Sequence, residues 1–151
     1  MSAVFEKNFQ MGWRDVDPNG HVANMVYLEY AVDARIAFFA SQGFPPANFK
    51  KHGFGPVIKT DLIEYFREVM MLDEISVTME NGGHSPDFSR FRVINNFTRA
   101  TGEPVARVTS IGGWLDLMQR KLIEPLDSIK EAWRSLSTTD DFEELRSSIR
   151  K

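Results

Sequence analysis

The sequence predicts a single α+β domain in which an antiparallel sheet curls around one long helix. The first observation is a long apolar segment without proline or glycine, residues 24–42, which predicts the helix. The second is a run of β-rich segments after it, at residues 56–67, 74–80, 88–98 and 105–117. The third is an extended segment before it, residues 4–16. A curled sheet of about five strands wrapped around the helix satisfies this order.

The helix has few polar positions, so apolar side chains occupy most of its circumference. Such a helix is expected to be wrapped by other structure and not laid on a surface. Asn24 stands at its start as a possible N-cap. Gly43, followed by Pro45 and Pro46, ends it.

Short turns join the later segments. Asn81-Gly82-Gly83 is expected to be a turn, and "RATGEP" is a hairpin signal. Residues 128–136 are expected to be helical. Residues 1–137 then form one domain, and residues 138–151 form a polar C-terminal helix or tail. One such sheet leaves a face or an edge uncovered, so self-association is expected.

Composition excludes several classes of protein. The chain has 151 residues and a net charge of −3, with acidic and basic residues mixed, so no electrostatic footprint for nucleic acid is present. No apolar run approaches the roughly 20 residues that span a bilayer, and no signal peptide is apparent. The sequence has no cysteine, which excludes disulfides, thiolate metal sites and cysteine nucleophiles. A cytoplasmic location fits these features.

The candidate functional stretch is "RDVDPNGHVANMVYLEY", residues 14–30. It places two aspartates, a Pro-Asn-Gly turn and a histidine directly before the helix. A helix N-terminus offers unpaired amides and a partial positive charge, which suit an oxyanion. A carboxylate and such donors are the minimum set for hydrolysing an activated acyl group. Taken alone, the same letters also describe an ordinary turn.

The stretch resembles the start of the 4-hydroxybenzoyl-CoA thioesterase-like branch of the hotdog superfamily. The match rests on an aspartate, a Gly-His-Val turn, an asparagine and an aromatic-containing helix: Asp17, Gly20, His21, Val22, Asn24 and Tyr27. Downstream, "IEYFREVMMLDEISVTME" and "FTRATGEPVARVTSIGGWLDL" resemble later strands of that family. Ala23 stands where many relatives have a second asparagine.

The resemblance implies a hotdog fold and an acyl-CoA thioesterase that hydrolyses a CoA thioester to a free acid and CoA. It implies no metal and no bound cofactor, because coenzyme A enters as part of the substrate. It also implies a homodimer or homotetramer with active sites at the subunit interface. Neither nucleic acid nor membrane is an expected partner.

The resemblance also assigns roles to residues. Asp17 matches the catalytic carboxylate, acting as nucleophile or as general base. The backbone amide of Asn24 would polarise the thioester carbonyl, with its side chain as a possible cap. His21 is an acid–base candidate or a turn-packing residue, and Tyr27 lines the acyl pocket or packs in the core. Substrate contacts are further expected from three residues of the strand at 56–67, which are Val57, Ile58 and Lys59.

Other assignments stay open. Glu29 and Asp33 share a helical face, as alternative nucleophiles or as partners of Arg35 or Arg67. Asp15 is expected to be structural. A non-catalytic CoA- or acyl-binding hotdog protein is the alternative function. An enoyl-CoA hydratase of the same superfamily is a second alternative, although the spacing from Asp17 to His21 is one residue too short for its motif.

Overall fold

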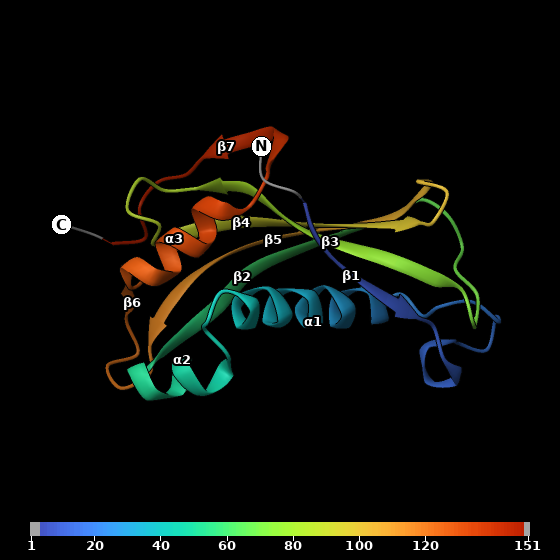
Figure 1. Ribbon diagram of the computed structural model, residues 1–151, viewed down its shortest axis with the longest axis horizontal. Coiled ribbons are helices and arrows are strands. Elements are labelled where there is room, and N and C mark those ends of the chain that lie inside the picture. The colour runs from blue at the N-terminus through green and yellow to red at the C-terminus, as the bar shows by residue number, and fades with distance from the viewer. Residues whose placement is uncertain (1–3, 150–151) are drawn as a thin grey trace.

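The computed structural model describes residues 4–149 and shows one curved sheet packed over a central helix (Figure 1). The main strand order is β1 (Phe5–Gln10), β3 (Glu74–His84), β4 (Arg90–Arg99), β5 (Pro104–Asp116), β2 (Phe54–Tyr65). Each neighbouring pair among these five strands is antiparallel. Two further strands raise the total to seven, against about five expected: β6 (Leu122–Ile123) pairs with β5, and β7 (Thr138–Glu144) pairs with β3.

The expected wrapped helix is α1 (Val26–Ser41), which lies along the concave face of the sheet (Figure 1). Its first half packs Tyr27, Ala31 and Ala34 into one core cluster. Its second half packs Phe38 and Phe39 into a second cluster, which also holds aromatic rings from the sheet and from α3 (Asp127–Ser135). A short helix that the sequence did not predict, α2 (Pro46–His52), follows α1.

Several predicted boundaries were wrong. The first strand ends at Gln10, and a 3-10 turn (Trp13–Asp15) replaces the rest of the expected extended segment. The N-cap of α1 is Met25 and not Asn24. Asn81, Gly82 and Gly83 do not form the expected turn, because β3 continues through them with a bulge to His84.

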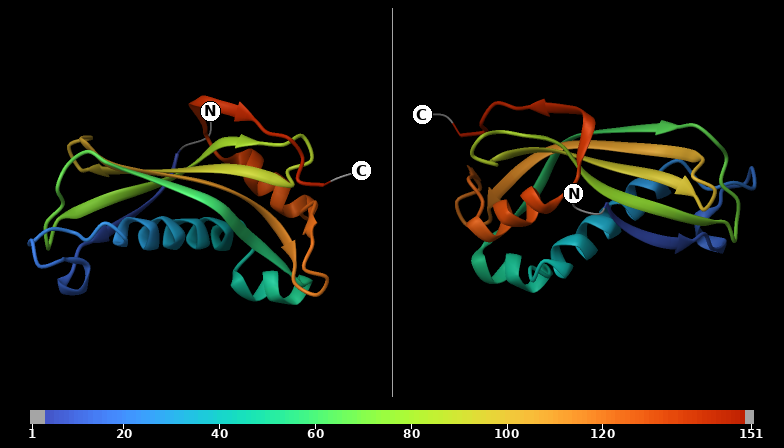
Figure 2. Two further views of the ribbon diagram at one scale, coloured as in Figure 1. Left: turned by 180° about the vertical axis from the view of Figure 1, so that it is seen from behind. Right: turned by 45° about the horizontal axis from the view of Figure 1, so that its top comes forward.

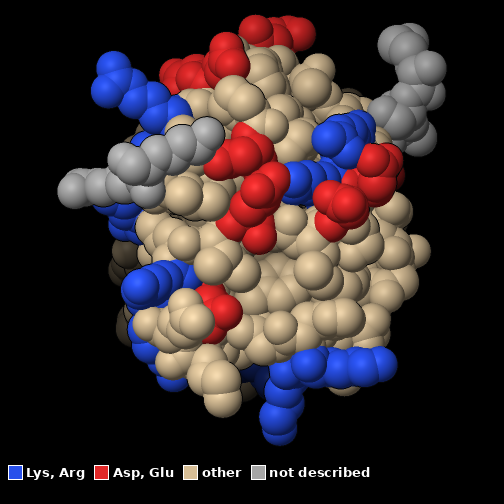
Figure 3. Space-filling view, turned by 90° about the vertical axis from the view of Figure 1, so that its left-hand side faces the viewer, with Lys and Arg blue, Asp and Glu red and all other residues tan. Residues whose placement is uncertain are grey.

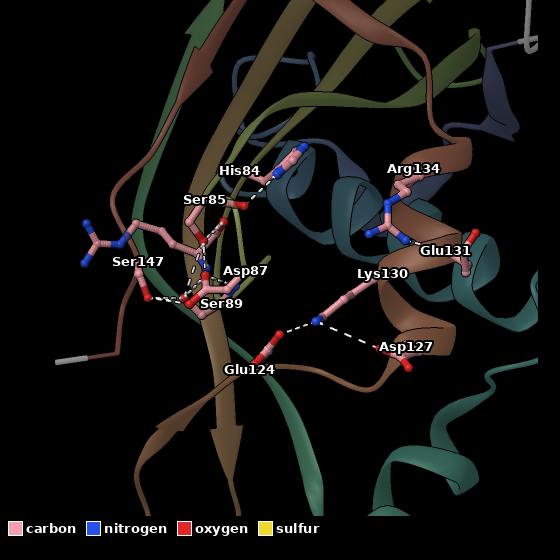
Figure 4. Close-up of polar contacts among 11 residues, drawn as sticks. His84, Ser85, Asp87, Ser89, Glu124, Asp127, Lys130, Glu131, Arg134 and Ser147 are labelled. Carbon is pink, nitrogen blue, oxygen red and sulfur yellow. Dashed lines mark hydrogen bonds and ion pairs between the residues drawn. The ribbon is translucent and has the colours of Figure 1, made fainter. Parts of the chain in front are cut away.

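The C-terminal segment also differs from expectation. Residues 138–144 form β7 instead of a polar helix, in parallel register with the end of β3. Residues 150 and 151 lie outside the described part. Beyond β7 the chain docks on the β3–β4 turn, where Ser147 Oγ donates to Asp87 Oδ2 at 2.5 Å (Figure 4). The same close-up shows Lys130 of α3 paired with Glu124.

The β2 edge of the sheet has no strand beside it among residues 4–149. The left view of Figure 2 shows β2 running from α2 along the length of the sheet, with α1 beneath it. Apolar side chains are exposed on both elements: Val32, Ile36, Ile58, Leu62 and Tyr65. An unpaired edge beside exposed apolar side chains is a surface suited to self-association.

Candidate active site

The Asp17 turn is a tight loop closed by backbone hydrogen bonds. The Asp17 amide donates to the His21 carbonyl at 2.9 Å, and the Gly20 amide donates to the Asp17 carbonyl at 3.0 Å. Gly20 has φ +85°, a conformation that favours glycine. The Asp17 carboxylate accepts the Asn19 amide at 2.9 Å, and its other oxygen lies 3.7 Å from His21 Nδ1. The loop therefore holds the Asp17 and His21 side chains next to each other.

Asp15 holds this turn against the helix. It is only 5% exposed, and its Oδ2 accepts the Gly12 amide at 2.7 Å and the Tyr30 hydroxyl at 2.8 Å. Its carbonyl accepts the Ala23 amide at 2.8 Å. Burial and the bond to Asp15 raise the pKa of Tyr30 to about 12. The structural role expected for Asp15 is confirmed.

The N-terminus of α1 keeps unbonded amide groups beside the turn. Within residues 4–149, the amides of Asn24 and Met25 have no hydrogen-bond partner. The Asn24 side chain does not cap the helix, so the capping role considered for it is wrong. Its carbonyl instead accepts the Tyr65 hydroxyl at 2.8 Å. The exposed amides of a helix N-terminus are available to an external acceptor.

These groups open on one cavity of about 380 Å³. Four of the predicted site residues line it together: Asp17, His21, Asn24 and Tyr27. Tyr27 packs edge-on against Tyr65 and Phe97, and burial raises its pKa. It is both pocket wall and core.

The opposite wall of the cavity comes from the end of β2 and the residues that follow it, to which the sequence analysis assigned no role in the cavity: Tyr65, Phe66, Arg67 and Glu68. Tyr65 lies 41 residues from the Asn24 carbonyl that it contacts. No local signal in the sequence links positions so far apart. The β-rich pattern at residues 56–67 predicted the strand β2, but it did not predict that the end of this strand contacts Asn24.

The remaining predicted residues lie elsewhere in the chain. Val57, Ile58 and Lys59 are in the first half of β2 and do not reach the Asp17 cavity. Ile58 lines a second cavity at the other end of α1. Glu29 and Asp33 lie on the exposed side of α1 and line neither cavity. Arg35 does not pair with them but bonds Asn95 and Ser110.

The arrangement suits acyl chemistry. Asp17, whose carboxylate is partly exposed, and Asn24, whose backbone amide is unbonded and lies just before α1, line one cavity. A carboxylate and a backbone amide are the groups needed to attack a carbonyl and to stabilise the oxyanion that forms. In the described part of the chain, no three His, Asp or Glu side chains gather as metal ligands. None of the helices between residues 4 and 149 is long and apolar enough to cross a membrane.

Comparison with known families agrees with this geometry. Residues 11–133 match the model of the thioesterase-like superfamily, so the chain belongs to that superfamily. The matched span begins just before the Asp17 turn and ends in α3. No curated protein sequence matches the chain.

Solved structures share the fold at low identity. A 1,4-dihydroxy-2-naphthoyl-CoA thioesterase from Synechocystis superposes with a TM-score of 0.79 at 19% identity, over 87% of this chain and 96% of that one. A Staphylococcus aureus protein solved in complex with CoA gives a TM-score of 0.81 at 15% identity, over 92% and 89%. A DHNA-CoA thioesterase from Staphylococcus aureus gives 0.78 at 15% identity, over 87% and 89%. The predicted hotdog fold is thereby confirmed.

Proposed function

We propose that the protein is an acyl-CoA thioesterase in which Asp17 carries the reaction. The observation that supports this most directly is the shared cavity, where the Asp17 carboxylate and the unbonded Asn24 amide lie together. Membership in the thioesterase-like superfamily supports the same class of reaction. The CoA thioesterases among its structural neighbours support CoA as the carrier.

In the proposed reaction the thioester carbonyl lies between Asp17 and the N-terminus of α1. Asp17 either attacks the carbonyl carbon, giving an anhydride that water cleaves, or removes a proton from an attacking water. In both routes the carbon–sulfur bond breaks, the thiolate of CoA takes up a proton, and the acid is released. The Asn24 amide donates to the oxyanion, a contribution typically worth about 10²–10³ in rate. His21, 3.7 Å from the carboxylate, orients Asp17.

We further propose that the active unit is a dimer joined along β2. The free edge and the apolar side chains beside it support this arrangement. Antiparallel pairing about the middle of β2 places Tyr65 of one protomer opposite the partner's Phe54. The Phe54 end of the partner's β2 then lies next to the Asp17 cavity, and the partner's Val57, Ile58 and Lys59 lie opposite Leu62, Asp61 and Thr60, three to five residues from Tyr65. These three residues reach the substrate only in that dimer.

The test is release of free CoA from a panel of aliphatic and aromatic acyl-CoAs by wild type, Asp17→Asn and Asp33→Asn. We expect turnover of at least one substrate by wild type and by Asp33→Asn, which removes a carboxylate outside the cavity. In Asp17→Asn the rate of turnover should fall by about 10²-fold or more while the fold is unchanged. A wild type that binds CoA but cleaves no thioester would instead support a non-catalytic binding protein.

A further inference from the structure

A second cavity, of about 370 Å³, lies at the far end of α1. The helices α1 and α2 supply Phe39 and Phe49 to its wall, and the sheet supplies Ile58 and Trp114. Figure 3 faces the end of the molecule that carries α2 and α3. Below the centre the surface is largely uncharged. Acidic side chains gather above it with some basic ones among them, and basic side chains lie along the left side and at the bottom, where α2 lies. An apolar cavity of this size suits an acyl chain or a ring.

One charged side chain, Arg35, interrupts the apolar lining of this cavity. Its Nε donates to Asn95 Oδ1 at 2.9 Å, and its Nη2 donates to Ser110 Oγ at 2.7 Å. Asn95 and Ser110 are fully buried. Ser110 in turn donates to Asp61 at 2.5 Å, so the only carboxylate near Arg35 in the described part of the chain is reached through a hydroxyl.

Arg35 has unused donors. Among residues 4–149, its Nη1 has no hydrogen-bond partner. Burial lowers the pKa of Arg35 to about 10, with Asp61 opposing the shift, so the side chain is still a cation at neutral pH. An arginine that only braced α1 against the sheet would need the bonds to Asn95 and Ser110 alone. A cation with free donors beside an apolar cavity is suited to a partner that is apolar along its length and anionic at its end.

The proposed dimer connects this cavity to the reacting carbonyl. Within one chain, Asn24 and Arg35 are separated by about 16 Å along α1. In the register proposed above, Phe54 lies opposite the partner's Tyr65, which lines the Asp17 cavity. Pro56, which lines the second cavity, is two residues from Phe54, about 7 Å along β2. An acyl group attached at one protomer's Asp17 cavity can therefore extend into the other protomer's second cavity.

We propose that Arg35 selects acyl groups that end in a carboxylate, so that the preferred substrates are ω-carboxyacyl-CoA thioesters. The carboxylate would accept hydrogen bonds from Nη1 and take the place of the missing ion-pair partner, while the chain fills the apolar part of the cavity. This proposal rests on the thioesterase function and on the β2 dimer proposed above.

The test compares suberoyl-CoA with octanoyl-CoA, which differ only at the far end of the acyl chain. We expect wild type to favour suberoyl-CoA in kcat/KM, and Arg35→Met to lose that preference by about 10-fold to 100-fold while retaining octanoyl-CoA hydrolysis. Arg134→Met removes an exposed cation that lines neither cavity and should keep the wild-type preference. Preference for octanoyl-CoA in wild type, or an unchanged preference in Arg35→Met, would overturn the proposal.

A binding measurement on wild type separates this proposal from the proposed activity and needs no variant. Two of the three tryptophans, Trp114 and Trp133, line the second cavity, so tryptophan fluorescence reports its occupation. Carboxyheptyl-CoA and octyl-CoA are thioethers that cannot be hydrolysed. Tighter binding of carboxyheptyl-CoA supports the selection by Arg35 even if no thioester is cleaved. Equal or weaker binding of carboxyheptyl-CoA overturns it even if thioesters are cleaved.

Discussion

Asp15 and Asp17 lie two residues apart, yet their carboxylates have different surroundings. Asp15 is buried and bonded to Gly12 and Tyr30, whereas Asp17 is partly exposed beside His21. The strand ends before both residues, so the alternation that would put them on one side does not apply. The sequence predicted a structural role for Asp15 from a strand break at Pro18, whereas the strand already ends at Gln10 and a 3-10 turn buries Asp15. It could not predict that Tyr30 is the partner of Asp15.

The bond between Tyr30 and Asp15 predicts a measurable loss of stability. Tyr30→Phe leaves a buried carboxylate oxygen with one donor fewer and should lower the free energy of unfolding by about 1–3 kcal/mol. Tyr27→Phe is the matched control, since within residues 4–149 no hydrogen bond involves the Tyr27 hydroxyl. Urea unfolding of the two variants gives the comparison. Equal losses in both variants would show that the bond contributes nothing.

Asp87 predicts a stability that depends on pH. Burial raises its pKa, but hydrogen bonds from Ser147, Ser85 and Ser89 outweigh burial and hold the pKa well below its usual range (Figure 4). A carboxyl group with a lowered folded-state pKa stabilises the fold above its unfolded pKa of about 3.9, and this stability is lost as the pH falls.

Asp87→Asn should therefore lower the Tm at neutral pH, and the difference from wild type should shrink as the pH falls below about 4. Thermal unfolding at several pH values measures this. Asp127→Asn, at a side chain that is 99% exposed, should differ little from wild type at any pH. A difference in Tm between Asp87→Asn and wild type that stays constant with pH would contradict the lowered pKa of Asp87.

At the scale of elements, local patterns predicted the main strands and α1, because each has an uninterrupted apolar or alternating run. They failed at β7, whose sequence "TTDDFEE" is polar and has no buried face to mark it. That strand exists because the end of β3 accepts it and because Arg92 and Arg107 pair with Asp141. Both causes are long-range contacts. The Asn81-Gly82-Gly83 prediction failed for the same reason, since Gly83 lies in the strand and faces β7.

Gly83 predicts a specific steric effect on β7. A Cβ at Gly83 would lie 2.3 Å from the carbonyl oxygen of Glu143, so Gly83→Ala should displace β7 and cost about 1–3 kcal/mol. A Cβ at Gly55 would meet no atom within 4 Å, so Gly55→Ala is the control. Amide hydrogen exchange should become faster in β7 in the first variant only. Unchanged exchange in β7 would contradict the close approach.

At the scale of the whole molecule, the sequence leads us to expect self-association but does not indicate which surface would be used. The apolar surface is assembled from α1 and β2, elements that become neighbours only when the sheet curls. The second cavity could not be predicted from the sequence for the same reason, because its lining comes from α1, α2, α3 and several strands.

The β2 dimer predicts a change of oligomeric state. Leu62 lies on β2 and is 58% exposed, so Leu62→Asp should place a charge in the proposed interface and give monomers. Met118→Asp, at a side chain that is 93% exposed outside β2, should remain a dimer. Sedimentation equilibrium distinguishes the two states. A Leu62→Asp protein that stays dimeric would rule out this interface.

The central claim is that Asp17 acts in the chemical step. The most direct measurement is the single-turnover rate of CoA release, for wild type and Asp17→Asn, on the best substrate of the panel. We expect the rate to fall about 10²-fold or more, while the Kd for a thioether analogue and the oligomeric state stay as in wild type. A single-turnover rate in Asp17→Asn close to that of wild type would contradict the account.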